Sequence, residues 1–294
     1  MKKNVKYILC IIISIIFLTG CSANSNKPDD ISKKIVAEIE FIDSKIIDML
    51  NNLNNISFQN YRLTSKKVEV SKESENAEET GGETKNSSDN ANSQSEEKTK
   101  NSPTSIETTE MIAENILTNS RDDIDWKLIK TEIELLNTSW SVTLYDIYKK
   151  NNSDNTDLLA FSDTLDKCIL SIKENNKKDS IANLANLYSY MPKFIEIASD
   201  DKKVKNIKEI KSKLINSYAA LENDDWTLVQ DNLSLAETSF AKLFEDLEYV
   251  KQNEYKMNKS FILLKELQNS TKENDKEIFY MKYINLMESL NTLK

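Results

Sequence analysis

The sequence predicts an all-α protein: a helical bundle built from two related units of about 100 residues, with an additional N-terminal helix and a disordered linker. Two observations lead to this prediction. Apolar residues recur at steps of three and four over long stretches, as in amphipathic helices, whereas the period-two alternation of strands is absent. In addition, the segment that begins at Asp125-Trp126 recurs without a gap at Asp225-Trp226.

Residues 1–21 have the layout of an export signal. A lysine-rich start precedes an apolar run over residues 7–18, which leads into Leu18-Thr19-Gly20-Cys21. This order resembles the lipobox of bacterial lipoproteins. The resemblance implies cleavage between Gly20 and Cys21, a lipid on Cys21, and a chain held on the outer face of the cytoplasmic membrane. The alternative is a transmembrane helix, but the apolar run is shorter than the ~20 residues that a span needs.

Three segments follow the signal. Residues 21–30 are a tether, and residues 31–63 are predicted to be an amphipathic helix, with apolar positions at Ile31, Ile35, Ile39, Ile42, Ile46, Met49, Leu53 and Ile56. Residues 64–104 are rich in Glu, Ser, Lys, Asn and Thr and cannot bury enough apolar area to offset their ordering entropy. We expect them to be a disordered polar linker, either a spacer or a segment that is modified or cleaved.

The remainder is predicted to consist of helical repeat unit 1 (105–200) and helical repeat unit 2 (201–294). Asp125-Trp126-Lys127-Leu128-Ile129 matches Asp225-Trp226-Thr227-Leu228-Val229, and the alignment extends to residues 146 and 246. The helices expected from apolar spacing cover 106–117, 126–147, 158–172 and 179–198 in unit 1, and 204–221, 226–247, 255–267 and 275–290 in unit 2. Pro192 should kink its helix, while Asp179 and Asp275 are expected to be N-caps.

The repeated unit resembles small helical proteins of unknown function from low-GC Gram-positive bacteria. That resemblance implies no particular activity. The abundance of Lys, Asn, Ile and Ser, together with the lipobox, also favours a Gram-positive source.

The composition argues against most enzyme classes. The chain has no histidine, so Ser-His-Asp and Cys-His catalysis and His-bearing metal sites are excluded. Its three glycines all lie at or before residue 82, so no phosphate-binding glycine loop follows. Removal of residues 1–20 takes away three lysines and no acids, which moves the net charge from −9 to −12. We expect no enzyme, no cofactor, no bound metal and no nucleic-acid partner.

Few residues are candidates for a site. Trp126 and Trp226 could contact a partner, because tryptophan is common at interface hot spots; both lie on the apolar helical face, so core packing is the favoured interpretation. Cys168 is expected to be a buried small hydrophobe rather than a reactive thiol. The lysines of 202–213 are interpreted as an ordinary solvated face, and the acidic pairs at helix junctions as caps rather than calcium ligands.

We therefore expect a membrane-anchored extracytoplasmic lipoprotein that binds another protein of the cell envelope without catalysis. The alternative is a carrier of a small apolar or cell-wall-derived ligand, associated with a transporter and held between helices. Methionines and aromatic residues of the last two helices would line that space.

Overall fold

The computed structural model describes residues 28–56, 63–68, 106–111, 123–151 and 155–293. These residues fall in two compact units, a helical unit and a unit of two paired strands. The lipobox, with Gly20 and Cys21, and residues 69–105 of the expected linker lie outside the described residues.

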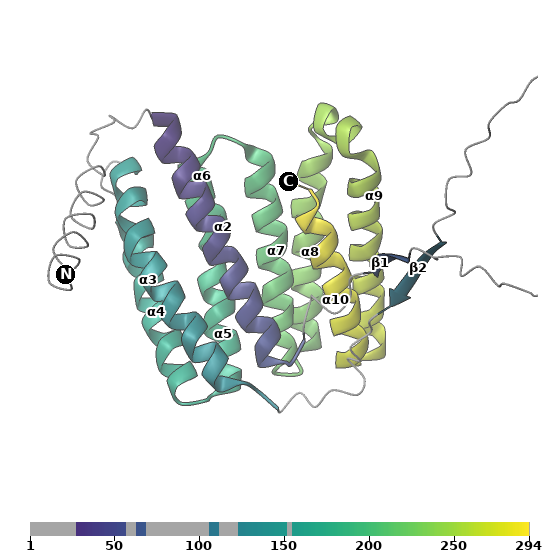
Figure 1. Ribbon diagram of the computed structural model, residues 1–294, viewed down its shortest axis with the longest axis horizontal. Coiled ribbons are helices and arrows are strands. Elements are labelled where there is room, and N and C mark those ends of the chain that lie inside the picture. The colour runs from purple at the N-terminus through teal and green to yellow at the C-terminus, as the bar shows by residue number, and fades with distance from the viewer. Residues whose placement is uncertain (1–27, 57–62, 69–105, 112–122, 152–154, 294) are drawn as a thin grey trace, which may run out of the picture. The chain divides into compact units, whose positions relative to one another are not determined.

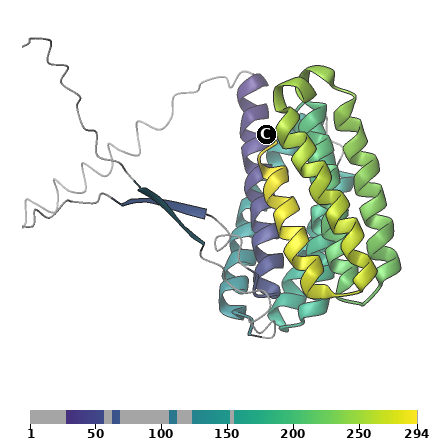
Figure 2. The same cartoon turned by 90° about the vertical axis from the view of Figure 1, so that its right-hand side faces the viewer.

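The helical unit confirms the all-α fold class (Figure 1). Its helices run up and down beside one another, as the second view also shows (Figure 2). In chain order they are α2 (Pro28–Leu53), α3 (Trp126–Lys150), α4 (Thr156–Lys173), α5 (Lys177–Tyr188), α6 (Met191–Ala198), α7 (Lys202–Leu221), α8 (Trp226–Phe244), α9 (Leu247–Ser270), a 3₁₀ turn (Thr271–Glu273) and α10 (Lys276–Asn291).

The helices contact one another in the same cyclic order in both halves of the helical unit. In the first half α2 contacts α3, α3 contacts α4, α4 contacts α5, and α5 returns to α2. In the second half α7, α8, α9 and α10 contact one another in the corresponding order, and α6 joins the halves by packing on α2, α3 and α7. Helix α2 therefore takes the place in the first half that the sequence assigned to residues 106–117.

Helices α2 and α7 end in the same local geometry. Asn55 and Asp224 adopt left-handed backbone angles, with φ of 50° and 56°. The chain then turns back, so that the N–H of Ile56 donates to the Asn51 carbonyl (2.8 Å) and that of Asp225 to the Ala220 carbonyl (3.2 Å). Asn and Asp tolerate this conformation better than most residues. The expected helix over 31–63 ends earlier, at Leu53, and it begins earlier, at Pro28, so residues 28–30 of the expected tether are helical.

The connections after these two turns differ greatly in length. The connection between α7 and α8 consists only of residues 222–225, whereas the connection between α2 and α3 extends over residues 54–125. Both following helices nevertheless begin alike. Asp125 accepts a hydrogen bond from the Leu128 N–H at 3.0 Å, and Asp225 accepts one from the Leu228 N–H at 3.0 Å. The first half thus carries a long insertion at a junction that is a tight turn in the second.

Two predicted helix boundaries were wrong. The helix expected over 179–198 is divided into α5 and α6, and Pro192 lies in the first turn of α6 instead of kinking a continuous helix. Proline is well accommodated there, because the first N–H groups of a helix have no intrahelical acceptor. Asp275 is the N-cap of α10, as expected, but α5 is capped by Asn176, whose side chain accepts from the Asp179 N–H.

The second unit contains the strands β1 (Leu63–Val68) and β2 (Ile106–Met111), paired antiparallel from Leu63 opposite Met111 to Val68 opposite Ile106. The helix predicted over 106–117 is therefore wrong at 106–111, and so is the disordered state expected for 64–68. The β2 sequence IETTEM contains adjacent threonines and an isoleucine, whose β-branched side chains favour extended backbone.

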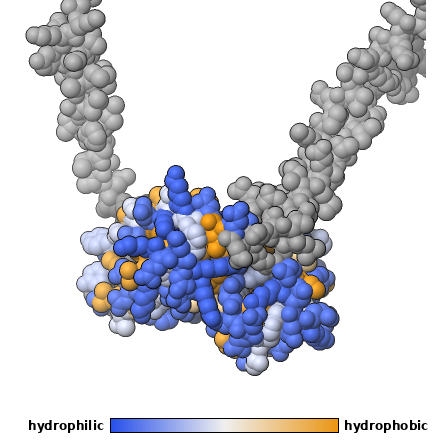
Figure 3. Space-filling view, turned by 90° about the horizontal axis from the view of Figure 1, so that it is seen from below, coloured by the Kyte–Doolittle hydropathy of each residue, from blue (hydrophilic) through white to orange (hydrophobic). Residues whose placement is uncertain are grey.

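The core of the helical unit uses most of the predicted apolar positions. Ile129, Ile133, Leu136, Trp140 and Ile147 of α3 are all buried. The corresponding face of α8 buries Val229, Leu233, Ala236 and Phe240, but Leu247 begins α9 and is 79% exposed, contrary to expectation. Seen from below, the surface is mainly hydrophilic with separate hydrophobic spots (Figure 3).

Candidate functional site

The two candidate tryptophans occupy equivalent places. Trp126 and Trp226 are the first residues of α3 and α8, directly after the capping aspartates, and both are half-buried. They are neither closed in the core, as Trp140 is, nor presented as fully exposed anchors. Their position at matching capped helix starts favours a role in helix packing.

A more distinctive surface runs along the outer side of α3. Several residues that point away from the core follow one another at alternating steps of three and four; we call them the α3 stripe: Leu128, Thr131, Leu135, Thr138, Val142 and Tyr145. Single exposed hydrophobics are normal on protein surfaces. A continuous row at this spacing is the pattern with which one helix packs along another.

The hydroxyl groups of the two threonines of the stripe donate within their own helix. The Thr131 hydroxyl donates to the Lys127 carbonyl at 3.0 Å, and the Thr138 hydroxyl donates to the Glu134 carbonyl at 2.9 Å. Such bonds to the preceding turn satisfy the hydroxyl within its own helix. Neither hydroxyl proton is therefore available to a partner that packs on the α3 stripe.

Part of this stripe recurs on α8. Leu128 and Leu135 are 44% and 49% exposed, and their counterparts Leu228 and Leu235 are 46% and 48% exposed. Both halves therefore have leucine at these two positions, outside the buried face of the helix and with nearly equal solvent exposure. The later positions differ, because Lys242 stands on α8 where Val142 stands on α3.

A shallow groove lies beside the α3 stripe, between α2 and α3. It has a volume of about 400 Å³ and is lined by Lys34, Ala37, Glu38, Phe41, Ser139, Val142 and Thr143. Phe41 is 40% exposed and Val142 is 52% exposed, so both present apolar surface at this point. The groove widens the apolar surface of the stripe toward α2.

The interior contains a cluster of charges where α2, α5 and α7 meet; we call Glu40, Asp43, Tyr188, Lys208 and Lys211 the buried charge cluster. The Lys208 ammonium lies 2.8 Å from Glu40 Oε1 and 3.1 Å from Asp43 Oδ2, and Lys211 Nζ lies 3.6 Å from Asp43 Oδ2. The Tyr188 hydroxyl donates to Asp43 Oδ1. Lys208 and Lys211 are each 2% exposed, so the prediction that they belong to a solvated face was wrong.

The cluster sets the protonation of its own members. Burial opposes the charge on Asp43, but Lys211, Lys208 and the Tyr188 hydroxyl outweigh that effect and lower the pKa of the carboxyl. Burial and the adjacent Asp43 charge raise the pKa of Tyr188 well above its ordinary value. Asp43 is therefore ionised and Tyr188 neutral near pH 7, which satisfies both partners of their hydrogen bond.

A second polar contact fixes the other end of α2. The Asn54 amide donates to the Tyr218 hydroxyl at 2.5 Å and to Glu222 Oε1 at 2.9 Å. The Tyr218 hydroxyl in turn donates to the Leu50 carbonyl at 2.9 Å, and the Tyr280 hydroxyl donates to Glu222 Oε1 at 2.6 Å. Helix α2 is thus attached to α7 at two levels.

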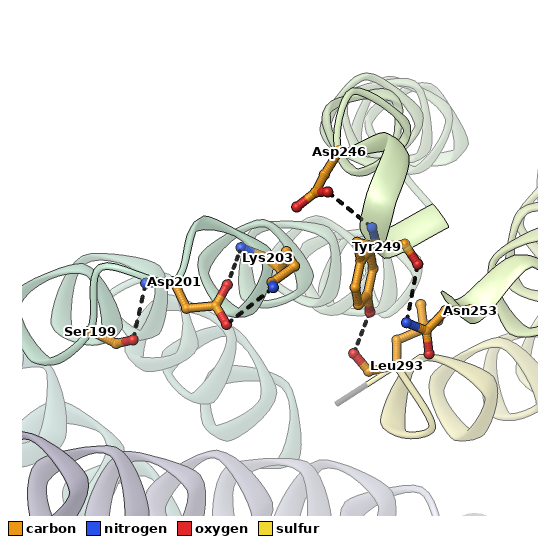
Figure 4. A network of polar contacts seen from close by, with 7 residues as sticks. All are labelled: Ser199, Asp201, Lys203, Asp246, Tyr249, Asn253 and Leu293. Carbon is orange, nitrogen blue, oxygen red and sulfur yellow. Dashed lines mark hydrogen bonds and ion pairs between the residues drawn. The ribbon is translucent and has the colours of Figure 1, made fainter. Parts of the chain in front are cut away.

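A pocket of about 570 Å³ lies where α6 leads into α7 and α8 leads into α9. Figure 4 shows the polar contacts of Asp201, Asp246 and Tyr249 in this region. Asp201 caps α7 and also lies 3.7 Å from the Lys203 ammonium. Asp246 accepts from the Tyr249 N–H at 3.0 Å, while the Tyr249 hydroxyl donates to the Leu293 carbonyl at 2.6 Å. In the acidic pairs at 200–201 and 224–225, the second aspartate of each pair is a helix N-cap: Asp201 caps α7 and Asp225 caps α8, as expected.

The lining of this pocket is mostly charged, whereas small-molecule sites are mainly apolar with a few polar groups. Its cations also have acidic neighbours, since Lys205 lies 2.6 Å from Glu196 and Lys242 lies 2.9 Å from Glu209. Among the methionines and aromatic residues that were expected to line a ligand space, Met257, Phe279, Tyr283 and Met287 pack in the core and are at most 1% exposed, whereas Tyr255 is 77% exposed.

Cys168 is fully buried, and burial raises the pKa of its thiol far above the ordinary value. Among the described residues, no group of three or more cysteine, aspartate or glutamate side chains is arranged to hold a metal ion. No helix in the same part of the chain is long and apolar enough to cross a membrane.

Neither the α3 stripe nor the buried charge cluster was predicted from the sequence. The alignment of the repeats already contained a signal for the stripe, because Leu128 and Leu135 recur as Leu228 and Leu235 off the apolar face. The cluster had no such signal, because Asp43 and the two lysines lie far apart in the sequence.

Comparison of the chain with protein families, with curated proteins and with solved structures gives no match.

Proposed function

We propose that this chain is a lipid-anchored extracytoplasmic protein that binds another protein of the cell envelope and catalyses no reaction. The α3 stripe is the observation that carries the proposal. Its heptad spacing fits an amphipathic helix of the partner, because a straight row of apolar side chains at steps of three and four matches a second helix. The groove that contains Phe41 and Val142 would accept larger side chains of that helix.

The lipid anchor in this proposal rests on the lipobox sequence. Cleavage before Cys21 leaves only 22–27 between the acylated cysteine and the start of α2. A stretch of that length reaches at most about 22 Å. The end of the helical unit at which α2 begins would then stay close to the membrane, and α3, which runs antiparallel to α2, would present its stripe to a neighbouring envelope protein.

A carrier of a small ligand is the second proposal, and the pocket of about 570 Å³ is the feature that favours it, since ligand sites run from ~300 to 1,000 Å³. The charged lining of that pocket fits an apolar ligand poorly. We therefore prefer protein binding.

Chemical crosslinking in intact membranes tests the preferred function. The wild-type lipoprotein is compared with Leu135→Asp, which places a charge in the α3 stripe, and with Leu247→Asp as the matched control. Leu247 is more exposed than Leu135 and lies on α9, away from the stripe. We expect one major protein adduct for the wild type and the control and its loss in Leu135→Asp, with thermal unfolding unchanged. Equal adducts in all three proteins would contradict the proposal.

A further inference from the structure

Helix α2 is placed in the helical unit by its contacts rather than by its connection to α3. The connection over 54–125 is long enough to allow more than one register of α2 beside α3. The free energy of closing such a loop changes only slowly with its length, so it would differ little between those registers. The contacts that set its register among the described residues are those that it makes in the groove in which it lies.

That groove recognises two features of α2. The first is a row of isoleucines at steps of four, three and four residues, which have no exposed surface: Ile35, Ile39, Ile42 and Ile46. This is the i, i+4, i+7 spacing with which an amphipathic helix fits into an apolar groove. The second is the pair of carboxylates of Glu40 and Asp43, which meet Lys208 and Lys211 on α7.

The ends of the groove are also defined by specific contacts. At the start of α2 the Lys34 ammonium lies 2.6 Å from Asp146 Oδ2 of α3. Near its end the Asn52 amide donates to Glu132 Oε2 of α3 at 3.1 Å, and Asn54 contacts Tyr218 and Glu222. A shift of α2 by one turn would break all of these contacts and leave the lysines of the buried charge cluster without Asp43.

We propose that α3, α5, α6 and α7 form a binding groove for an amphipathic helix that carries two carboxylates at a spacing of i, i+3 among isoleucines, and that α2 occupies it as the chain's own ligand. The charged lysines select the carboxylates, and the apolar walls select the isoleucine row. A cut in the connection between α2 and α3 leaves the two parts associated, so that the rest of the protein stays bound to the helix nearest the anchor.

The test uses the full chain with a protease recognition sequence inserted between Phe58 and Gln59, before β1, so that both paired strands stay in the second part. After cleavage, the two parts are expected to co-elute in native gel filtration at micromolar concentration and to separate only in denaturant. Elution as two separate species without denaturant would overturn the proposal. No step requires the lipid, so this result is independent of the proposed anchor and of the envelope partner.

A second arm isolates the carboxylates. The cleaved protein is refolded from denaturant in the presence of a fluorescent peptide of residues 28–56, which competes with the protein's own α2 for the groove. Its incorporation is followed by anisotropy, so that only the peptide is altered and the groove keeps its wild-type sequence. The Asp43→Asn peptide is expected to bind at least tenfold more weakly than the wild-type peptide, whereas Asp30→Asn, the same change at an exposed position, binds like the wild type. Equal binding of all three peptides would overturn the role assigned to the carboxylate.

Discussion

Replacement of Asp43 by Asn tests the buried charge cluster most sharply. The change keeps the shape of the side chain and an acceptor for the Tyr188 hydroxyl, but removes the negative charge that lies 3.1 Å from Lys208 and 3.6 Å from Lys211. Removal of one partner from a buried ion pair typically costs about 3–5 kcal/mol.

The remaining contacts place the expected loss at the lower end of that range. Lys208 keeps Glu40 at 2.8 Å, and the Lys211 ammonium still donates to Asn291 Oδ1 at 2.7 Å. We therefore expect Asp43→Asn to lower the free energy of unfolding by about 3 kcal/mol at pH 7. With a denaturant slope of about 3 kcal/mol per molar urea, the unfolding midpoint followed by circular dichroism falls by about 1 M.

The effect should depend on pH in a defined direction. The folded-state pKa of Asp43 is lowered, so its contribution is fully present above its unfolded value of about 3.9 and disappears as the pH falls through the folded value. The difference between wild type and Asp43→Asn should consequently shrink below about pH 4. The control Asp30→Asn should stay within about 0.5 kcal/mol of the wild type. A change of less than that for Asp43→Asn at pH 7 would refute the reasoning.

Four further outcomes are expected, three from the structure and one from the lipobox sequence. Tyr283→Phe should leave the free energy of unfolding unchanged or raise it by up to about 1 kcal/mol, because the Tyr283 hydroxyl is buried without a hydrogen-bond partner among the described residues. Tyr188→Phe should lower the free energy of unfolding by about 1.5–3 kcal/mol in the same urea titration, since it removes a hydrogen bond to a carboxylate. Cys168 should react with a thiol reagent only after denaturant is added, as burial raises its pKa and closes access; rapid labelling of the native protein would contradict its placement. Cys21→Ala should leave an unprocessed precursor that takes up no fatty-acid probe, and normal labelling of that variant would show that the lipobox interpretation is wrong.

Helix positions followed from the sequence where one physical signal dominated. The isoleucine row of α2 and the paired motifs at Trp126 and Trp226 each combine apolar periodicity with a start or stop residue, and the structure confirms these helices. Predicted helix boundaries were wrong where the same local feature is compatible with either the end or the start of a helix. Pro192 is compatible with either a kink or a first turn, and only packing of the neighbouring helices decides between them.

The place of α2 in the bundle could not be predicted from the sequence. Its partners on α7 lie in a distant part of the sequence, and the intervening insertion hides its equivalence to α7. Lys208 and Lys211 illustrate the same difficulty, because lysines beside an apolar row usually face solvent. They are buried here because Asp43 occupies the facing position, and a single sequence contains no signal that joins the two.

Site-specific photo-crosslinking tests the proposed function most directly. A photoreactive amino acid replaces Leu135 in the α3 stripe or, as a control, the exposed Lys251 on α9, and membranes of cells that express the full-length chain are irradiated. The proposal predicts a discrete adduct with one envelope protein from position 135, mapped to an amphipathic helix of that protein, and none from position 251. The absence of an adduct at position 135, or the same adducts from both positions, would contradict it.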